Sequence, residues 1–157
     1  MLTCAIIDDE PLAVSLLESY VENTPFLQLQ GKFSNAIEAM AELRAKSVDL
    51  LMLDIQMPEL SGLELAKIIP STTRIIFTTA FSQYAIEGYK VNAIDYLLKP
   101  ISYADFLSSV SKAQSIIKEQ VAQSAVTEPD SFFVKSDYKL VRISYDDILY
   151  IEGLKDY

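Results

Sequence analysis

The sequence predicts an α/β protein in which a parallel sheet is covered by helices on both faces. Five short apolar runs alternate with five amphipathic stretches along most of the chain, and this alternation is typical of consecutive β-α units. Right-handed crossovers favour the strand order 2-1-3-4-5 for a sheet of this size. The chain has 157 residues, of which 50% are apolar and 22% are charged, so it can bury a hydrophobic core.

The predicted strands are short apolar runs that end at polar residues. Residues 50–53 (LLML) are too apolar for a half-exposed strand, so they indicate a strand that is buried on both faces. Residues 27–30 alternate leucine with glutamine and suit a strand with one wetter face. The five strands are expected at residues 2–7, 27–30, 49–55, 74–79 and 93–98.

The first two helices are expected where apolar residues recur every three or four positions. Pro11 suits the first turn of a helix. The apolar face of this first helix is expected to comprise Leu12, Leu16, Leu17 and Tyr20. Asn35 begins a second helix, whose expected apolar residues are Ile37, Met40, Ala41 and Leu43.

Three further helices complete the predicted units. A short helix follows Ser61 and Gly62 and ends by Pro70, and another covers residues 83–89. The last helix begins at residue 102 or 103 and ends near residue 123. Its expected apolar residues are Phe106, Leu107, Val110, Ala113 and Ile117.

The composition changes after residue 117. Residues 118–130 are polar, rich in alanine, serine and glutamine, and contain Pro129, as expected for a helix end and a linker. Short strands are predicted at residues 132–135, 139–143 and 147–152. Because three short strands bury too little surface to fold alone, we interpret residues 131–157 as the opening of a second domain that the chain cuts short.

Composition and charge exclude several classes of function. Thirteen basic residues against 22 acidic ones give a net charge of −9, so no basic face for nucleic acid is evident. The absence of histidine excludes Ser-His-Asp and Cys-His nucleophile systems. With Cys4 as the one cysteine, no intrachain disulfide or cysteine-based zinc cluster can form. We expect a cytoplasmic protein without a membrane span, because no export signal or long apolar stretch is present.

Three carboxylates are expected to meet at one edge of the sheet. Asp8 and Asp9 follow the first strand and Asp54 ends the third, and ligands bind beyond the carboxyl ends of these strands in the predicted order. A hard cation would relieve the repulsion among the carboxylates, and Mg²⁺ prefers such oxygen ligands. We predict Mg²⁺ held by Asp9 and Asp54, with Asp8 acting through water. The alternative is that these acids cap the helices that follow.

Two more polar residues are expected at the same edge. Lys99 directly follows the fifth strand and precedes Pro100, and an X-Pro bond is the kind that can be cis. A lysine there can hold a phosphoryl oxygen, whereas an exposed surface lysine is the alternative. Thr79 ends the fourth strand and offers a hydroxyl, or it serves only as a β-branched strand residue.

Four segments, in this order and at matching strand ends, give the chain a family resemblance. They are residues 6–11 (IIDDEP), 53–58 (LDIQMP) with Gly62, 77–80 (FTTA) and 95–100 (DYLLKP). Over roughly residues 1–122 the chain resembles the receiver domain of two-component response regulators. The resemblance implies a flavodoxin-like (βα)5 fold and a signalling protein that catalyses only its own phosphorylation and dephosphorylation.

The same resemblance implies the roles of individual residues. Asp54 would be the phosphoacceptor, and Lys99 would meet the phosphoryl group. Asp8, Asp9, Asp54 and the backbone carbonyl of Gln56 would hold Mg²⁺, and the switch pair would be Thr79 and Tyr96. The implied partners are a sensor histidine kinase and a second copy, bound through the face formed by the fourth helix, the fifth strand and the fifth helix.

Residues 131–157, after a linker at 123–130, resemble the start of a LytTR-type DNA-binding domain. The matching segments are 132–135 (FFVK), 148–153 (ILYIEG) and 155–157 (KDY). The resemblance implies control of transcription, with DNA bound only through the complete second domain because the family's DNA contacts lie mostly beyond Tyr157.

Two other functions remain possible on the sequence alone. A Mg²⁺-dependent aspartyl-phosphate phosphatase would usually carry an acid two residues after its nucleophile, where this chain has Gln56, and an amide cannot act as general acid or base. A phosphate-independent interaction module would keep the fold without the switch. The joint presence of Asp54, Thr79 and Lys99 argues against this second alternative.

We predict that the 157-residue chain alone does not bind specific DNA. Residues 121–157 contain four basic and seven acidic residues, a net of −3, so the counterion release that drives association with DNA is missing. A gel-shift or fluorescence titration in physiological salt should show no sequence-specific complex. Specific binding near ~10⁻⁸ M, the range of complete modules, would contradict the prediction.

Overall fold

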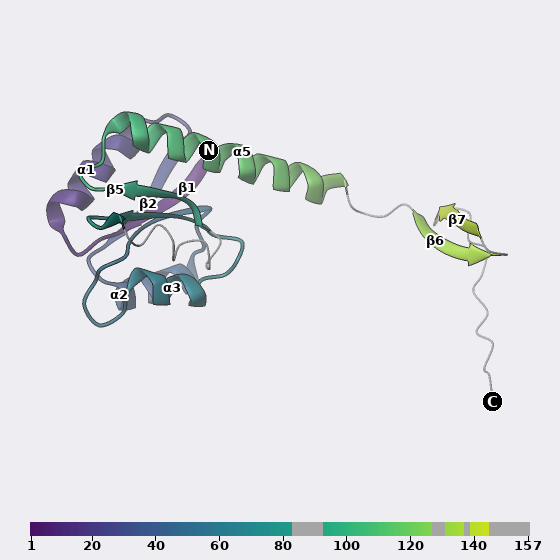
Figure 1. Cartoon of the computed structure of the whole chain (residues 1–157), viewed down its shortest axis with the longest axis horizontal. Coiled ribbons are helices and arrows are strands. Elements are labelled where there is room, and N and C mark those ends of the chain that lie inside the picture. The colour runs from purple at the N-terminus through teal and green to yellow at the C-terminus, as the bar shows by residue number, and fades with distance from the viewer. Residues whose placement is uncertain (83–92, 127–130, 137–138, 145–157) are drawn as a thin grey trace. The chain divides into compact units, whose positions relative to one another are not determined.

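A computed structural model describes residues 1–82, 93–126, 131–136 and 139–144 (Figure 1). The chain divides into two compact units, Met1–Ile117 and Lys118–Tyr157. Two predicted elements, the helix at 83–89 and the strand at 147–152, lie outside the described residues.

The first unit contains a parallel five-stranded sheet in the order β2-β1-β3-β4-β5, which confirms the predicted flavodoxin-like order. Every strand lies close to its predicted bounds. The strands are β1 (Leu2–Ile7), β2 (Leu27–Phe33), β3 (Leu50–Asp54), β4 (Arg74–Thr79) and β5 (Ala93–Leu98). A switch point therefore lies between β1 and β3, as the sequence predicted.

Strand β2 is longer than the predicted 27–30. Its pairing with β1 shifts between Cys4 and Ala5, where the partners change from Leu29 to Gly31. The extra residue, Gln30, interrupts the two-residue period, so the sequence pattern stops there although the pairing continues to Phe33.

The described helices are α1 (Pro11–Glu22), α2 (Ala36–Ala45), α3 (Gly62–Ile68) and α5 (Tyr103–Val126). Side chains cap the starts of α2, α3 and α5, whereas α1 begins at a proline without a side-chain cap. The Asn35 side chain accepts a hydrogen bond from the N–H of Glu38 at 2.8 Å. At α3, Ser61 and Glu64 form a reciprocal capping box, which fixes the start of the helix after the β3 loop.

The predicted apolar faces of α1 and α2 are partly wrong. In α1, Leu17 and Val21 are buried, whereas Leu12 is 78% exposed. Leu12 and Leu17 are five residues apart, about 140° around a helix, so both cannot face the sheet. In α2 the small residues Ala36 and Ala39 are buried, and the larger apolar residue Ile37 is 51% exposed.

Two apolar clusters fill the two faces of the sheet. One packs side chains of β1 and β3 against α1 and α5, and the other packs the opposite side chains of the same strands against α2 and α3 (Figure 1). Residues 50–53 are completely buried, as predicted for a central strand covered on both faces. Along α5, Phe106, Val110 and Ala113 are buried, which confirms most of its predicted stripe.

The second unit contains a two-stranded antiparallel sheet. Strand β6 (Ser131–Ser136) pairs with β7 (Lys139–Ser144), from Ser131 opposite Ser144 to Ser136 opposite Lys139. This matches the first hairpin predicted for the tail. Helix α5 extends to Val126, three residues beyond its predicted end, because alanine and glutamine favour helix over a flexible linker. No helix in the described part of the chain is long and apolar enough to cross a membrane.

Candidate functional site

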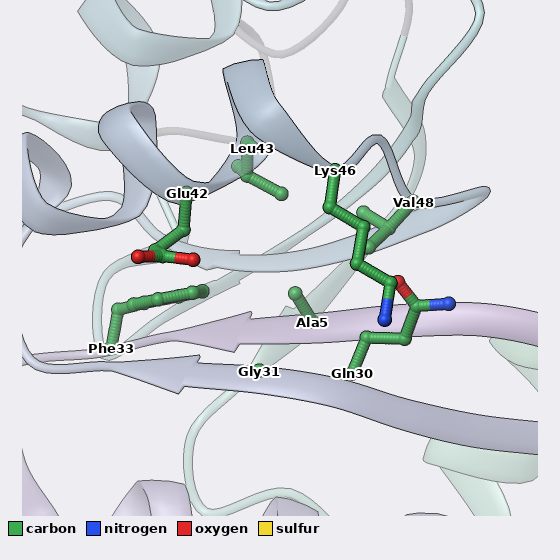
Figure 2. A pocket seen from close by; sticks show the side chains of 8 residues that line it. All are labelled: Ala5, Gln30, Gly31, Phe33, Glu42, Leu43, Lys46 and Val48. Atoms are coloured by element: carbon green, nitrogen blue, oxygen red, sulfur yellow. The ribbon is translucent and has the colours of Figure 1, made fainter.

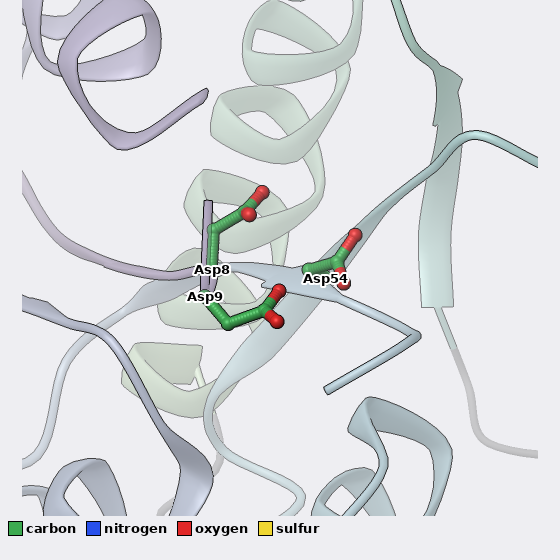
Figure 3. Close-up of side chains that lie close together, drawn as sticks. All are labelled: Asp8, Asp9 and Asp54. Carbon is green, nitrogen blue, oxygen red and sulfur yellow. The ribbon is translucent and has the colours of Figure 1, made fainter. Parts of the chain in front are cut away.

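The three predicted carboxylates meet at the carboxyl edge of the sheet. Asp8 and Asp9 follow β1, Asp54 ends β3, and the two strands pair through Ile7 opposite Leu53. One carboxylate oxygen from each aspartate lies within 4.8 Å of the others, and Figure 3 shows the side chains of Asp9 and Asp54 extending from neighbouring strand ends. Asp8 and Asp54 are buried, and Asp9 is exposed.

Lys99 lies among these carboxylates and is only 17% exposed at its side chain. Its Nζ is 2.8 Å from Asp8 Oδ2, 3.1 Å from Asp54 Oδ1 and 3.5 Å from Glu10 Oε2. The alternative of an exposed surface lysine is therefore wrong. Glu10 was not among the predicted site residues, although it directly follows Asp9 in the sequence.

Asp8 has two structural tasks. Its Oδ1 accepts a hydrogen bond from the backbone N–H of Glu10 at 3.0 Å, at the residue that directly precedes α1. Its Oδ2 pairs with Lys99. Because the N–H of Glu10 precedes the first turn and no side chain caps α1, this bond is not a helix cap and the helix-cap interpretation does not hold for Asp8.

The charges in the cluster alter two pKa values. Burial, and after it the charge of Asp8, raises the pKa of Asp54 to about 6, although the charge of Lys99 and its hydrogen bond act in the opposite direction. Burial lowers the pKa of Lys99, but its hydrogen bond with Asp8 and the charges of Asp54 and Asp8 outweigh that effect, so the pKa lies above its ordinary value. The cluster contains more carboxylates than ammonium groups. Its carboxylate oxygens are ligands that suit a divalent cation.

Thr79 ends β4, the strand that pairs with β3, and Tyr96 lies on β5, the strand beyond β4. Thr79 is buried, and its Oγ1 accepts a hydrogen bond from the N–H of Phe81 at 3.1 Å. Its carbonyl accepts one from the N–H of Lys99 at 2.7 Å, so the end of β4 holds the residue that follows β5. Tyr96 pairs with Phe77 across the strands, and their ring centroids are 5.4 Å apart.

The loop after β3 forms one wall of the site. Asp9 and Gln56 line the same hollow, which has a volume of about 550 Å³ and is completed by Ile55, Met57, Pro58, Ser61 and Leu63. This hollow is large enough for a small molecule to reach the exposed carboxylate of Asp9. The predicted contribution of Gln56 through its backbone carbonyl is compatible with this placement beside Asp9.

A second hollow is lined by Lys99 and by the start of α1. Its volume is about 230 Å³, and its lining residues are Glu10, Leu12, Ala13, Leu16, Lys99, Pro100 and Ile101. The exposed leucines of α1 thus place apolar surface directly beside the charged cluster. The Lys99–Pro100 peptide bond is cis, the geometry that the sequence analysis named for this position.

A third cavity lies between β2 and α2, away from the carboxylates (Figure 2). Ala5, Gly31 and Val48 are among its lining residues, and its volume is about 40 Å³. That volume is close to the share of one water molecule in the liquid. This cavity is therefore much smaller than the hollow beside Asp9 at the carboxyl edge of the sheet.

The comparison with protein families identifies the class of this fold and site. Residues 4–111 match the response regulator receiver domain. The chain belongs to this family. Receiver domains bind Mg²⁺ at an acidic pocket and interact with sensor histidine kinases, and in this chain Asp8, Asp9 and Asp54 form the acidic cluster.

Similar curated proteins are regulatory proteins. The chain is 42% identical over 106 residues to the transcriptional regulatory protein BtsR of Escherichia coli (strain K12), covering 66% of this chain and 44% of BtsR. It is 36% identical over 130 residues to an uncharacterized response regulatory protein of Vibrio parahaemolyticus, covering 82% and 52%. The chain therefore spans about half the length of the curated relatives it matches.

Similar solved structures are receiver domains. The response regulatory domain of mrkE from Klebsiella pneumoniae superposes with a TM-score of 0.70 at 26% identity, covering 75% of this chain and 99% of that chain. A response regulator receiver domain protein from Clostridium thermocellum gives 0.65 at 23% identity, covering 78% and 99%. The second likeness shows the shared fold.

We predict that Gly62→Ala disturbs the loop that carries Asp54 and Gln56. A Cβ at residue 62 would lie 2.0 Å from the carbonyl oxygen of Asp54, a backbone atom that cannot move without shifting β3. The free energy of unfolding should fall by about 2 kcal/mol or more, as measured by urea denaturation. Gly31→Ala is the control, because its Cβ would meet the movable ring of Phe33. An equal or larger loss in that variant would contradict the prediction.

We predict that Asp54→Asn stabilises the metal-free protein at pH 7.5. The raised pKa of Asp54, about 6 against an ordinary 3.8, means that its ionised form destabilises the folded state above pH 6. The stability gap between variant and wild type should grow between pH 4 and pH 6 and then stay constant, reaching about 1 to 3 kcal/mol. Urea unfolding in EDTA at several pH values measures it, and a gap independent of pH would refute this assignment.

Proposed function

We propose that this chain is the receiver part of a two-component response regulator that accepts a phosphoryl group on Asp54. The observation that carries the proposal is the position of Asp54, a buried carboxylate paired with Lys99 and next to two further aspartates at the carboxyl edge of the sheet. The phosphoryl donor is a phosphohistidine of a sensor histidine kinase. That histidine belongs to the partner, because this chain contains none.

The transfer uses Asp54 as the nucleophile. An Asp54 carboxylate oxygen attacks phosphorus in line, forming the new P–O bond while the P–N bond to the donor imidazole breaks. The ammonium of Lys99, already 3.1 Å from Asp54 Oδ1, stabilises charge on the phosphoryl oxygens. Because burial already restricts the motion of the Asp54 carboxylate, little further orientational freedom is lost on reaching the transition state.

The acidic cluster would hold Mg²⁺. Asp9, Asp54 and the backbone carbonyl of Gln56 are the proposed ligands, and Asp8 acts through a water molecule. When bound, the ion neutralises charge on the transferring group. Excess carboxylate charge around Lys99 supports this assignment, and oxygen donors of this kind suit Mg²⁺.

The response to phosphorylation is proposed to begin at Thr79. Its hydroxyl, which now accepts from the N–H of Phe81, would turn to hydrogen-bond the phosphoryl group. Tyr96, which packs against Phe77, would move inward into the space that is released. Phosphorylation would thereby shift an existing equilibrium between two arrangements.

The kinase would reach Asp54 over α1. A donor histidine must approach the carboxyl edge of the sheet, and the adjacent hollow exposes Leu12 and Leu16 beside Lys99. Exposed apolar surface of this kind is typical of a protein-protein contact. This placement would let one docking event bury the leucines and bring the phosphohistidine to Asp54.

The output is proposed to be dimerisation and control of transcription in the cytoplasm. A second copy would bind through the face of the fourth helix, β5 and α5, where Leu98 and Leu107 are exposed. DNA would be bound through a complete LytTR-type domain. The proposed boundaries are 1–122 for the receiver, 123–130 for the linker and 131–157 for the start of the output domain. The β6–β7 hairpin is compatible with them.

The proposal predicts that acetyl phosphate and Mg²⁺ phosphorylate the chain on Asp54. Intact-mass spectrometry should detect one phosphoryl group on wild type and none on Asp54→Asn, because an amide is a poor nucleophile. Asp105→Asn, an exposed carboxylate at the start of α5, is the control and should be modified like wild type. An unmodified wild type would favour a phosphate-independent module, and steady release of phosphate over many turnovers would favour a phosphatase.

A further inference from the structure

The hydroxyl of Tyr20 contacts the segment that follows Lys99. Tyr20 lies near the end of α1, and its Oη donates a hydrogen bond to the carbonyl oxygen of Ile101 at 3.0 Å. Ile101 is buried and two residues from Lys99. The other side of this segment is held at Lys99 itself, whose N–H donates to Thr79 O at 2.7 Å. Residues 99–101 are thus fixed at both ends.

Helix α1 joins the two charged parts of the site. It begins at Pro11, directly after Asp8, Asp9 and Glu10, so its first turn is tied to the carboxylates. Its last turns carry Tyr20, which is tied to the lysine segment. A helix of 12 residues is a stiff connection, so the hydrogen bond from Tyr20 sets where the lysine segment lies relative to the acids.

An aromatic cluster supports this bond. The ring of Tyr20 lies 5.2 Å from that of Tyr103 and 5.4 Å from that of Phe106, measured between centroids. The hydroxyl of Tyr103 donates instead to the carbonyl of Asn23 at 3.0 Å, at the end of α1. The two tyrosines therefore share a cluster, but only Tyr20 bonds the segment next to Lys99.

We propose that Tyr20 is a positioning residue for Lys99, acting through its hydrogen bond to Ile101 and the stiffness of α1. It touches neither the carboxylates nor the transferring group in the mechanism above. Its role is to keep the Lys99 ammonium within reach of Asp8 and Asp54. The consequence for catalysis rests on the proposed function, whereas the consequence for the location of Lys99 does not.

The first test measures Lys99 directly. Lysine acetylation by an N-hydroxysuccinimide ester, followed by peptide mass spectrometry, should be slow at Lys99 in wild type because the ammonium is ion-paired and mostly buried. Tyr20→Phe keeps the ring and removes the donor, and should speed acetylation of Lys99 about fivefold, the factor corresponding to one ordinary hydrogen bond. Exposed Lys112 is the internal reference.

Matched variants separate positioning from a general loss of structure. Tyr103→Phe removes a hydroxyl from the same cluster and should leave Lys99 acetylation unchanged. Tyr20→4-aminophenylalanine keeps a para donor and should restore slow acetylation. Equal acetylation of Lys99 in Tyr20→Phe and wild type, or an equal rise in both phenylalanine variants, would overturn the proposal.

The second test measures phosphorylation by acetyl phosphate. Tyr20→Phe should be phosphorylated about fivefold more slowly than wild type, and in a Lys99→Ala background it should cause no further loss. A full additional loss in that background would mean that Tyr20 acts elsewhere and would overturn the proposal. If wild type is not phosphorylated at all, the proposed function fails, and the acetylation result still decides the role of Tyr20.

Discussion

The placement of one ammonium among several carboxylates is the interaction on which this site depends. Lys99 lies within 3.5 Å of oxygens from Asp8, Asp54 and Glu10, and Asp9 joins the same cluster. In a buried environment, repulsion among these carboxylates would force some of them to take up a proton unless a cation is held among them. Burial and the charge of Asp8 raise the pKa of Asp54 even though Lys99 lies beside it.

The rest of the fold serves to hold these groups in place. The parallel order places the ends of β1 and β3 side by side, and the close approach at Gly62 lets the loop after Asp54 turn back over the strand end. Thr79 holds the backbone of Lys99 from β4. These restraints come from β1, β3, β4 and the loop after β3, so the position of the cluster depends on contacts between elements that are distant in sequence.

The strands and the acidic cluster could be predicted because each depends on short stretches of sequence. The runs before Asp8 and before Asp54 are buried strands, and the run before Lys99 is a half-buried one. Parallel order then brings their ends together. The exposed face of α1 could not be predicted in the same way. Leu12 resembles a core residue in sequence, and only the packing of Leu17 and Val21 against the sheet shows that it faces outward.

Long-range hydrogen bonds could not be predicted from the sequence either. Tyr20 and Ile101 are 81 residues apart, and the tyrosine's place in a helical stripe predicts burial but gives no acceptor for its hydroxyl. The same is true of Glu10, whose contact with Lys99 joins two separate loops. Periodicity assigns a residue to a face of its element, whereas its partners depend on how the elements assemble.

Under the proposed function, the charge balance would let a phosphoryl group on Asp54 act as a signal. Four carboxylates already face one ammonium, and a divalent cation would bring the cluster close to neutrality. A phosphoryl group adds negative charge that Lys99 alone cannot offset while it remains paired with Asp8. In the proposed mechanism a further donor would come from Thr79, whose hydroxyl lies at the end of the neighbouring strand β4. Recruiting this hydroxyl would break its contact with Phe81, so an imbalance of charge at the end of β3 would become a change of structure after β4.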